Sequence, residues 1–207
     1  LTRIFSFQAL YAGIAPAKAR AVLAVITYMD TVRGVFYPEG GMHAVPRAMA
    51  QALTDAGVPI HLGVEVSEIL RRGDGAVAGV ATADGTRLAA DAVVATVDLP
   101  VVYDRLLPGI RAPRTIRTGA YSPSAVVWHV GAAGAPGAHL RHHNIHFGDD
   151  WAGAFEAIID RGALMPDPSR LVTVPSVTDP TAAPAGSTAM YVLEPVPHTG
   201  AGLDWRR

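Results

Sequence analysis

The segment Tyr37-Pro38-Glu39-Gly40-Gly41-Met42 contains the signals for a change from extended chain to helix. Pro38 fixes its own φ and favours an extended conformation at Tyr37. Gly40 and Gly41 lack a Cβ atom, so they accept positive φ and permit the close approach of backbone or ligand. A tight turn is the simplest interpretation of two adjacent glycines, and this motif alone does not establish a binding site.

A helix is predicted to follow this turn. Apolar residues recur after Met42 at helical spacing, and Gly57 suits the C′ position at the helix end. The apolar residues are Val45, Met49, Leu53 and Ala56. The helix would contain about 15 residues and extend about 22 Å. Its free N-terminal amides, beside Gly40 and Gly41, are suited to hold an anionic or electron-rich edge of a cofactor.

Composition limits the classes of protein to consider. Half of the 207 residues are hydrophobic and the net charge is −1, so a folded chain is expected. Basic residues are few and scattered, and we expect no nucleic-acid partner. The absence of cysteine excludes disulfides and a cysteine nucleophile and is compatible with the cytoplasm. Apolar runs fall far short of the roughly 20 residues of a spanning helix.

The two ends of the sequence lie in unusual contexts. Leu1 falls inside an apolar segment, and Arg207 comes shortly after a turn-like Gly-rich stretch. We therefore expect this chain to be an interior piece of a longer protein.

The N-terminal region is predicted to be helical. Residues 3–13 fit a short helix, and residues 15–29 fit a longer helix that is amphipathic to nearly all apolar. Its apolar stripe consists of Ala19, Val22, Leu23, Ile26 and Met29. Such a stripe either packs in an ordinary core, as most do, or faces an apolar cavity.

The middle of the chain has the pattern of strands and tight turns. We predict a short strand at residues 58–62, followed by a three-stranded meander of residues 64–71, 77–81 and 86–89 that is joined by Gly and Asp turns. Residues 91–97 fit a buried strand, after which Asp98 would cap a helix. After a crossing at residues 108–123, the remainder predicts strands at 124–131, 142–147, 171–177 and 187–193. A helix at 149–161, opened by a capping Asp, lies among these strands. The second half is thus a mostly β lobe with one helix.

Three histidines offer an alternative chemistry. His142 and His146 would share one face of a strand, with His143 on the other, and His198 or Asp149 is a conceivable third metal ligand. A polar strand surface is the commoner explanation, so no metal is predicted. No Gly-x-Ser-x-Gly elbow occurs, which argues against Ser-His-Asp catalysis. Glu39 is either a polar group near a cofactor or a solvated turn carboxylate.

Several motifs, taken in order, resemble the bacterial-type phytoene desaturases, which are FAD-dependent carotenoid oxidoreductases related to flavin amine oxidases. They are Phe5-Ser6-Phe7-Gln8, the segment from Tyr37 to Met42, His146-Phe147-Gly148, Pro175-Ser176-Val177-Thr178-Asp179-Pro180, Ala183-Pro184-Ala185-Gly186, Val192-Leu193-Glu194-Pro195-Val196-Pro197-His198 and Leu203-Asp204-Trp205. Together they cover nearly the whole chain.

The resemblance implies an α/β (mixed α+β) fold: part of a split, Rossmann-like FAD-binding domain and a mostly β substrate domain with helices. Residues 1–36 would be the helical part of the substrate or lid region, 37–107 the middle segment of the FAD domain, and 108–207 an incomplete substrate domain. No Gly-x-Gly-x-x-Gly fingerprint is present in this chain, so the pyrophosphate site is expected outside it. The chain alone is not expected to hold FAD.

The resemblance also implies cofactor contacts and a reaction. Val66 would offer backbone groups to the adenine of FAD, and Gly40 and Gly41 would lie beside the cofactor. FAD would take a hydride from an allylic carbon of a phytoene-like C40 polyene, while a proton leaves to solvent or to a weak base. No catalytic residue and no oligomeric state are indicated. A cytoplasmic enzyme with a peripheral membrane contact is expected. A related isomerase, ketolase or diapo-carotene desaturase, or a non-catalytic isoprenoid-binding module, remains an alternative.

Overall fold

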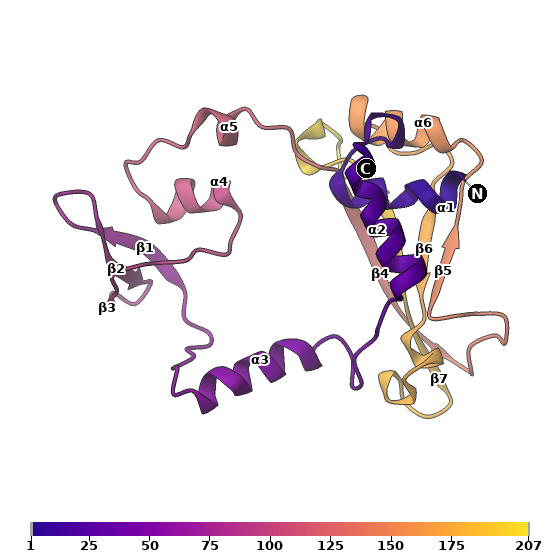
Figure 1. Cartoon of the computed structure of the whole chain (residues 1–207), viewed down its shortest axis with the longest axis horizontal. Coiled ribbons are helices and arrows are strands. Elements are labelled where there is room, and N and C mark those ends of the chain that lie inside the picture. Colours follow the sequence, from indigo (N-terminus) through magenta and orange to yellow (C-terminus); the bar gives the residue numbers. More distant parts are fainter. Residues whose placement is uncertain (1, 207) are drawn as a thin grey trace. The chain divides into compact units, whose positions relative to one another are not determined.

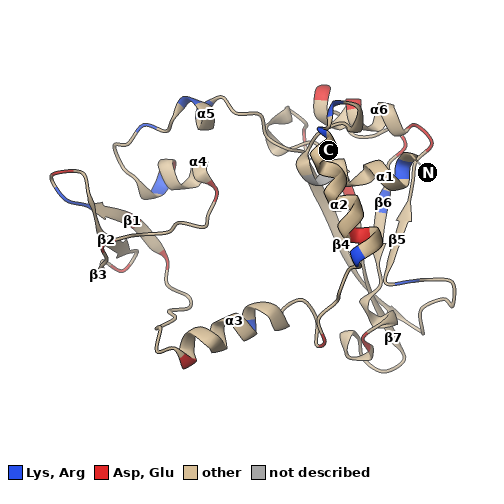
Figure 2. Cartoon of the chain, viewed as in Figure 1, with Lys and Arg blue, Asp and Glu red and all other residues tan. Residues whose placement is uncertain are grey.

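The computed structural model describes residues 2–206 and contains helices together with two antiparallel sheets (Figure 1). The mixed α/β class is therefore confirmed. Leu1 and Arg207, the outer ends of the predicted first and third segments, lie outside the described residues. The chain divides into two compact units, one of Leu1–Met49 with Tyr121–Arg207 and the other of Ala50–Ala120. Acidic and basic residues are interspersed along the chain in both units (Figure 2). The functional roles of the segments 1–36, 37–107 and 108–207 stay predictions.

A four-stranded antiparallel sheet forms the centre of the first unit. Its strands lie in the order β4-β7-β6-β5. They are β4 (Ser124–Ala133), β5 (His143–His146), β6 (Arg170–Thr173) and β7 (Ser187–Val196). The long β4 and β7 pair over their whole length, with Ser124 opposite Val196 and Ala133 opposite Ser187. The predicted strands of the second half are thereby confirmed, although β6 stops before Pro175, which begins a 3₁₀ turn.

Short helices accompany this sheet. They are α1 (Thr2–Ser6) with the 3₁₀ turn Phe7–Ala12, α2 (Ala24–Tyr28) with the π-helical turn Met29–Arg33, and α6 (Trp151–Phe155) with the π-helical turn Glu156–Asp160. Ala154, Ile158 and Met165 form a buried cluster beside α6. Val174 is completely buried, so the core of this unit lies near the end of β6.

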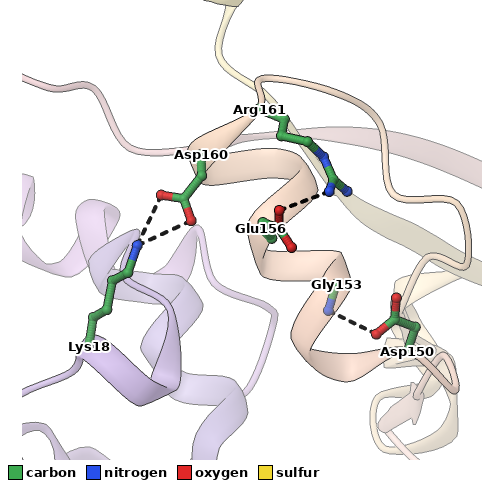
Figure 3. A network of polar contacts seen from close by, with 6 residues as sticks. All are labelled: Lys18, Asp150, Gly153, Glu156, Asp160 and Arg161. Carbon is green, nitrogen blue, oxygen red and sulfur yellow. Dashed lines mark hydrogen bonds and ion pairs between the residues drawn. The ribbon is translucent and has the colours of Figure 1, made fainter.

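Polar contacts hold the start of α6 and the π-helical turn Glu156–Asp160 that follows it (Figure 3). The side chain of Asp150 accepts a hydrogen bond of 2.8 Å from the N–H of Gly153, as an N-cap residue does. Arg161 pairs with Glu156 at 3.0 Å, and Lys18 donates to both carboxylate oxygens of Asp160 at 3.1 Å. The predicted helix at residues 149–161 and its capping Asp are therefore confirmed.

The predicted single helix at residues 15–29 is wrong. The segment contains 3₁₀ turns at Pro16–Lys18 and Ala21–Leu23 before α2 begins. Ala19 and Arg20 are extended, with ψ of 140° and 144°, and this interrupts the helix. Helix propensity is a weak force that tertiary contacts override. Here Lys18 binds Asp160 on one side of the break, and the buried Thr27 bonds Gln8 on the other.

The second unit contains the predicted three-stranded meander. It is formed by β1 (Val66–Arg71), β2 (Val77–Thr82) and β3 (Arg87–Ala89), in the order β1-β2-β3. Gly75 and Gly85 have φ of 89° and 88° in its two turns. The unit also contains α4 (Leu99–Val101), the π-helical turn Val102–Leu106 and α5 (Arg114–Arg117).

Two strand predictions in this unit are wrong. Residues 58–62 and 91–97 form no strand, and Leu62 and Val94 are 87% and 88% exposed. A strand needs a neighbour that takes its backbone hydrogen bonds, and no described residue pairs with either segment. Asp98 precedes α4 as predicted, but its side chain accepts no hydrogen bond from the helix.

Helix α3 (Ala44–Asp55) confirms the predicted helix after the glycine pair, and it contains the boundary between the two units. Gly57 follows it with φ of 75°, which is the left-handed conformation of a C′ residue. The apolar side chains of Val45, Met49 and Leu53 are exposed in the part of the chain that the structure describes.

Candidate functional site

One face of the four-stranded sheet carries two adjacent rows of side chains that run across the strands. The first row is apolar and consists of Val127, Leu193, Leu171 and Ile145. The second row is polar and consists of His129, Tyr191, Thr173 and His143. Each residue of the second row lies two positions along its strand from one of the first, so both rows occupy the same face.

An apolar hollow of about 590 Å³ lies against the first row. Ile145, Leu171 and Leu193 form its floor. The aromatic side chains of Phe7, Phe147 and Trp151 also line it. The volume falls within the range of roughly 300–1,000 Å³ that is typical of small-molecule sites.

The aromatic lining of this hollow is fixed by contacts among its own members. The rings of Phe7 and Phe147 meet edge to face with centroids 6.3 Å apart, and those of Phe147 and Trp151 do so at 5.5 Å. The indole N–H of Trp151 donates to the hydroxyl oxygen of Ser6 at 3.1 Å, which satisfies its one polar atom. The lining is thus preformed and nearly apolar.

The charge that Arg170 brings to this hollow is compensated. Its Nε lies 2.7 Å from Oε2 of Glu194, whose side chain is only 15% exposed. Asp30 and His143 are the other titratable residues that line the apolar hollow.

A second hollow of about 1230 Å³ adjoins the first within the same unit. Its lining comes from residues 35–42, from His142 and His143, from the turns at 173–181 and from Tyr191. Val35 and His143 line both hollows. The two hollows therefore meet at Val35 and His143.

The predicted glycine turn borders this second hollow. The N–H of Gly41 donates to the carbonyl oxygen of Pro38 at 3.0 Å, and Gly40 and Gly41 have φ of 77° and 88°. This left-handed backbone requires glycine, because a side chain is rarely tolerated there. A Cβ on Gly40 would meet no atom within 4 Å, whereas one on Gly41 would lie 3.4 Å from the hydroxyl of Tyr37. Gly40 therefore leaves the border of the second hollow without a side chain.

The turn lies against a second motif, Pro175 to Pro180. The carboxylate of Asp179 accepts hydrogen bonds from the hydroxyl and N–H of Thr181, at 2.6 and 2.9 Å. These bonds from Thr181, together with the nearby N–H of Gly40, lower the pKa of Asp179. Two segments that are distant in the sequence are thus brought together at one hollow.

The neighbouring histidines occupy defined positions. The His142 ring lies 4.5 Å from that of Tyr37 and 4.7 Å from that of His143. Nδ1 of His142 is 2.5 Å from Oγ1 of Thr178, and Nδ1 of His143 is 3.0 Å from Oγ1 of Thr173. Burial and, secondly, the neighbouring His142 lower the pKa of His143. Among residues 2–206 no three His, Asp or Glu side chains gather as metal ligands would.

Val66, the third predicted cofactor residue, belongs to the other unit. It starts β1 at the edge of the meander, opposite Thr82. The N–H of Thr82 donates to Thr86, which is on the side away from β1. In an antiparallel ladder, this places the N–H and C=O of Val66 on the outer side of β1, away from β2. There they pair with no other strand among the residues that the structure describes.

The sequence alone predicted neither the aromatic lining of the apolar hollow nor the position of His143 where the two hollows meet, which we call the junction. The three histidines and the His146-Phe147-Gly148 motif marked the region. Their arrangement depends on the register between β5, β6 and β7, which links distant segments.

These features define a mixed α/β chain with an apolar hollow on one face of an antiparallel sheet. The model of the family described as flavin containing amine oxidoreductase matches residues 1–154. The chain belongs to this family. Its membership confirms the predicted flavin cofactor, FAD.

Relatives confirm the resemblance to phytoene desaturases. The chain is 49% identical over 209 residues to a phytoene dehydrogenase of Streptomyces griseus, with 100% of this chain and 40% of the relative covered. It is 35% identical to a zeta-carotene-forming phytoene desaturase of Myxococcus xanthus, again over 100% and 40%. A 4,4'-diapophytoene desaturase of Staphylococcus aureus is 34% identical, over 99% of this chain and 42% of the relative. The chain thus spans about two fifths of the length of these relatives.

Each unit, taken by itself, has one backbone feature that is compatible with a bound cofactor. These features are the open space beside Gly40 in the first unit and the outward peptide groups of Val66 in the second.

Among the described residues, the helices are too short or too polar to span a membrane.

Proposed function

We propose that the whole protein is an FAD-dependent carotenoid desaturase that removes hydrogen from phytoene-like C40 polyenes. The observation that carries this proposal is the apolar hollow of about 590 Å³ on the sheet, with its aromatic lining. A long hydrocarbon offers no hydrogen bonds, so its binding depends on the burial of apolar surface. The names of the relatives support the same substrate class.

The residues of the apolar hollow bind and orient the polyene. Phe147 and Trp151 supply rigid aromatic surface, and Leu171 and Leu193 supply the floor. When bound, the flavin supplies the capacity to accept a hydride. The apolar lining excludes water and holds the reacting bond in a fixed position, which is the main contribution of the protein to such chemistry.

We propose that Gly40, Gly41 and Val66 hold parts of the cofactor. Gly40 and Gly41 would allow it to approach the second hollow, because no side chain occupies the space beside Gly40. The backbone groups of Val66 would pair with its adenine. In this scheme residues 37–107 are the middle segment of a split Rossmann-like domain.

A peripheral membrane contact is part of this proposal, because the substrate resides in lipid. Basic residues lie along α5 and the loop before it (blue in Figure 2), and their side chains are exposed. They are Arg111, Arg114 and Arg117. Each basic residue near an anionic membrane surface contributes about 1 kcal/mol of attraction.

Flotation with anionic vesicles tests the membrane contact. Replacement of Arg111, Arg114 and Arg117 by Gln should reduce the bound fraction. The matched control replaces Arg71, Arg72 and Arg87 in the meander, which removes the same charge from the same unit. If both variants lose the same bound fraction, the binding depends on total charge and not on a membrane-contacting surface at α5.

The desaturase function is tested with the whole protein, FAD and phytoene in liposomes. The product spectrum reports new conjugated double bonds. Leu193→Gln should raise KM because it places an amide in the floor of the hollow, whereas Val192→Gln, on the opposite face of β7, should not. Binding of phytoene without any oxidation would favour an isoprenoid-binding module instead.

A further inference from the structure

His143 is the titratable residue that the two hollows share among the described residues. On its apolar side it adjoins Ile145, two residues along the same strand, where the polyene is proposed to lie. On its polar side it shares the second hollow with Gly40, where the cofactor is proposed to approach. A group at this junction is placed to act on the carbon that faces the cofactor.

The imidazole of His143 is held from two sides. Thr173 is its cross-strand neighbour, is only 3% exposed, and places Oγ1 at 3.0 Å from Nδ1. The ring of His142 lies 4.7 Å away and is itself held by Tyr37 and Thr178. When Nδ1–H donates to Thr173, the lone pair of the imidazole lies on Nε2.

We propose that Nε2 of His143 accepts the proton that the polyene loses during desaturation, an inference that rests on the proposed function. The flavin, when bound, would supply the acceptor for the hydrogen that leaves one C–H bond with both electrons, as a hydride. The neighbouring C–H bond loses its proton to Nε2, and its electron pair forms the new carbon–carbon double bond. The substrate loses two hydrogens and two electrons, and His143 becomes an imidazolium until it releases the proton to water.

The protonation state suits this role. His143 is exposed at the rim of both hollows and only partly covered, and this partial burial and, secondly, the neighbouring His142 lower its pKa and favour the neutral imidazole. A neutral imidazole is sufficient, because the carbon next to a departing hydride becomes strongly acidic.

Other titratable groups around the two hollows are less well placed. Arg170 is paired with Glu194, and hydrogen bonds to Asp179 stabilise its charged form and make it a weaker base. Asp30 lines the apolar hollow only. The remaining groups are Tyr37, Glu39, His142 and Tyr191, which line the second hollow only.

The test uses the holoenzyme with His143→Gln, which keeps a polar side chain of similar size but no base. We expect kcat to fall about 100-fold, the usual contribution of a positioned base, while the affinity for phytoene changes less than about two-fold. His139→Gln, in an exposed loop that lines neither hollow, is the control and should retain full activity.

The pH dependence supplies a second measurement. The wild-type kcat should fall as pH drops below the lowered pKa of His143, since protonation removes the lone pair, and the profile of His143→Gln should be flat over that range. In ¹³C-histidine NMR of the wild type, the His143 signal should titrate below the usual range and shift when phytoene binds. A His143 signal that does not respond to phytoene would overturn the proposal.

The outcomes separate this inference from the proposed function. Full activity in His143→Gln, or a large loss in Asp30→Asn with none in His143→Gln, would overturn the role of His143 and leave the desaturase function standing. A wild-type holoenzyme that neither binds nor oxidises phytoene would overturn both. If His143→Gln does not fold, Thr173→Val should shift the falling limb of the pH profile to lower pH, and an unshifted limb would contradict the proposal.

Discussion

The ring of Tyr37 lies 4.5 Å from the ring of His142, and this contact joins the glycine turn to the end of the four-stranded sheet. Tyr37 opens the turn that contains Gly40 and Gly41, and His142 precedes β5. The position of the turn beside the second hollow therefore depends partly on an aromatic pair.

Removal of this ring contact should weaken the fold of the first unit. Tyr37→Leu keeps an apolar side chain but loses the aromatic pair, which contributes about 0.5–1.5 kcal/mol beyond simple burial. A double-mutant cycle with His142→Ala, measured by urea unfolding, isolates that coupling. Tyr28→Leu, on a half-exposed tyrosine, is the comparison for loss of an aromatic side chain. A coupling energy near zero would contradict the prediction, because the two rings would then be neighbours that do not stabilise each other.

The ion pair at the wall of the apolar hollow should contribute measurably to stability. Glu194→Gln removes a charge that is 15% exposed and lies 2.7 Å from Arg170. We expect a loss of about 1 kcal/mol in the free energy of unfolding. Glu156→Gln breaks the more exposed pair with Arg161 and should cost less, about 0.5 kcal/mol or below. Equal losses would contradict the importance of burial for the first pair.

Acid should remove part of the stability of the meander. Hydrogen bonds from the side chain of Thr82 and then the N–H of Thr86 lower the pKa of Asp84 below 3.8, its ordinary value. Because the folded pKa is the lower one, this stabilisation is present above the unfolded pKa and is lost as pH falls through the folded value. Wild type should therefore exceed Asp84→Asn in stability at neutral pH, and the difference should shrink in strong acid. A difference that is constant with pH would exclude the charge as its cause.

Local sequence signals predicted the elements whose partners are close in the chain. The meander with Gly75 and Gly85, and helix α3 before Gly57, follow from turn residues and periodicity. The long pairing of β4 with β7 was predicted as two strands, but its register was not, because it joins distant segments. Residues 91–97 have strand composition but no partner among the described residues, so composition alone misled the prediction.

The candidate site was predictable only in part. The glycine turn was found from its residue types, since Gly40 and Gly41 require positive φ. The junction at His143 was not, because it depends on the alignment of β5 with β6 and on a loop that brings Tyr37 to His142. Periodicity assigns a side chain to a face of a strand but does not identify the segment that covers that face.

The glycine turn provides the sharpest test of the cofactor site. Gly40→Ala and Gly41→Val each place a Cβ on backbone with φ of 77° or 88°, which costs about 1–2 kcal/mol in a left-handed conformation. Both should also lower the FAD content of the purified whole protein, because Gly40→Ala adds an atom to the open space at the second hollow and Gly41→Val crowds the hydroxyl of Tyr37, which lines that hollow. Gly57→Ala is the matched control: its φ is 75° and a Cβ there meets no atom within 4 Å, so it carries the same strain at the end of α3. We expect it to lower stability while FAD content stays at the wild-type level. If all three variants lose FAD equally, the loss reports backbone strain, and the segment from Tyr37 to Met42 is a structural turn.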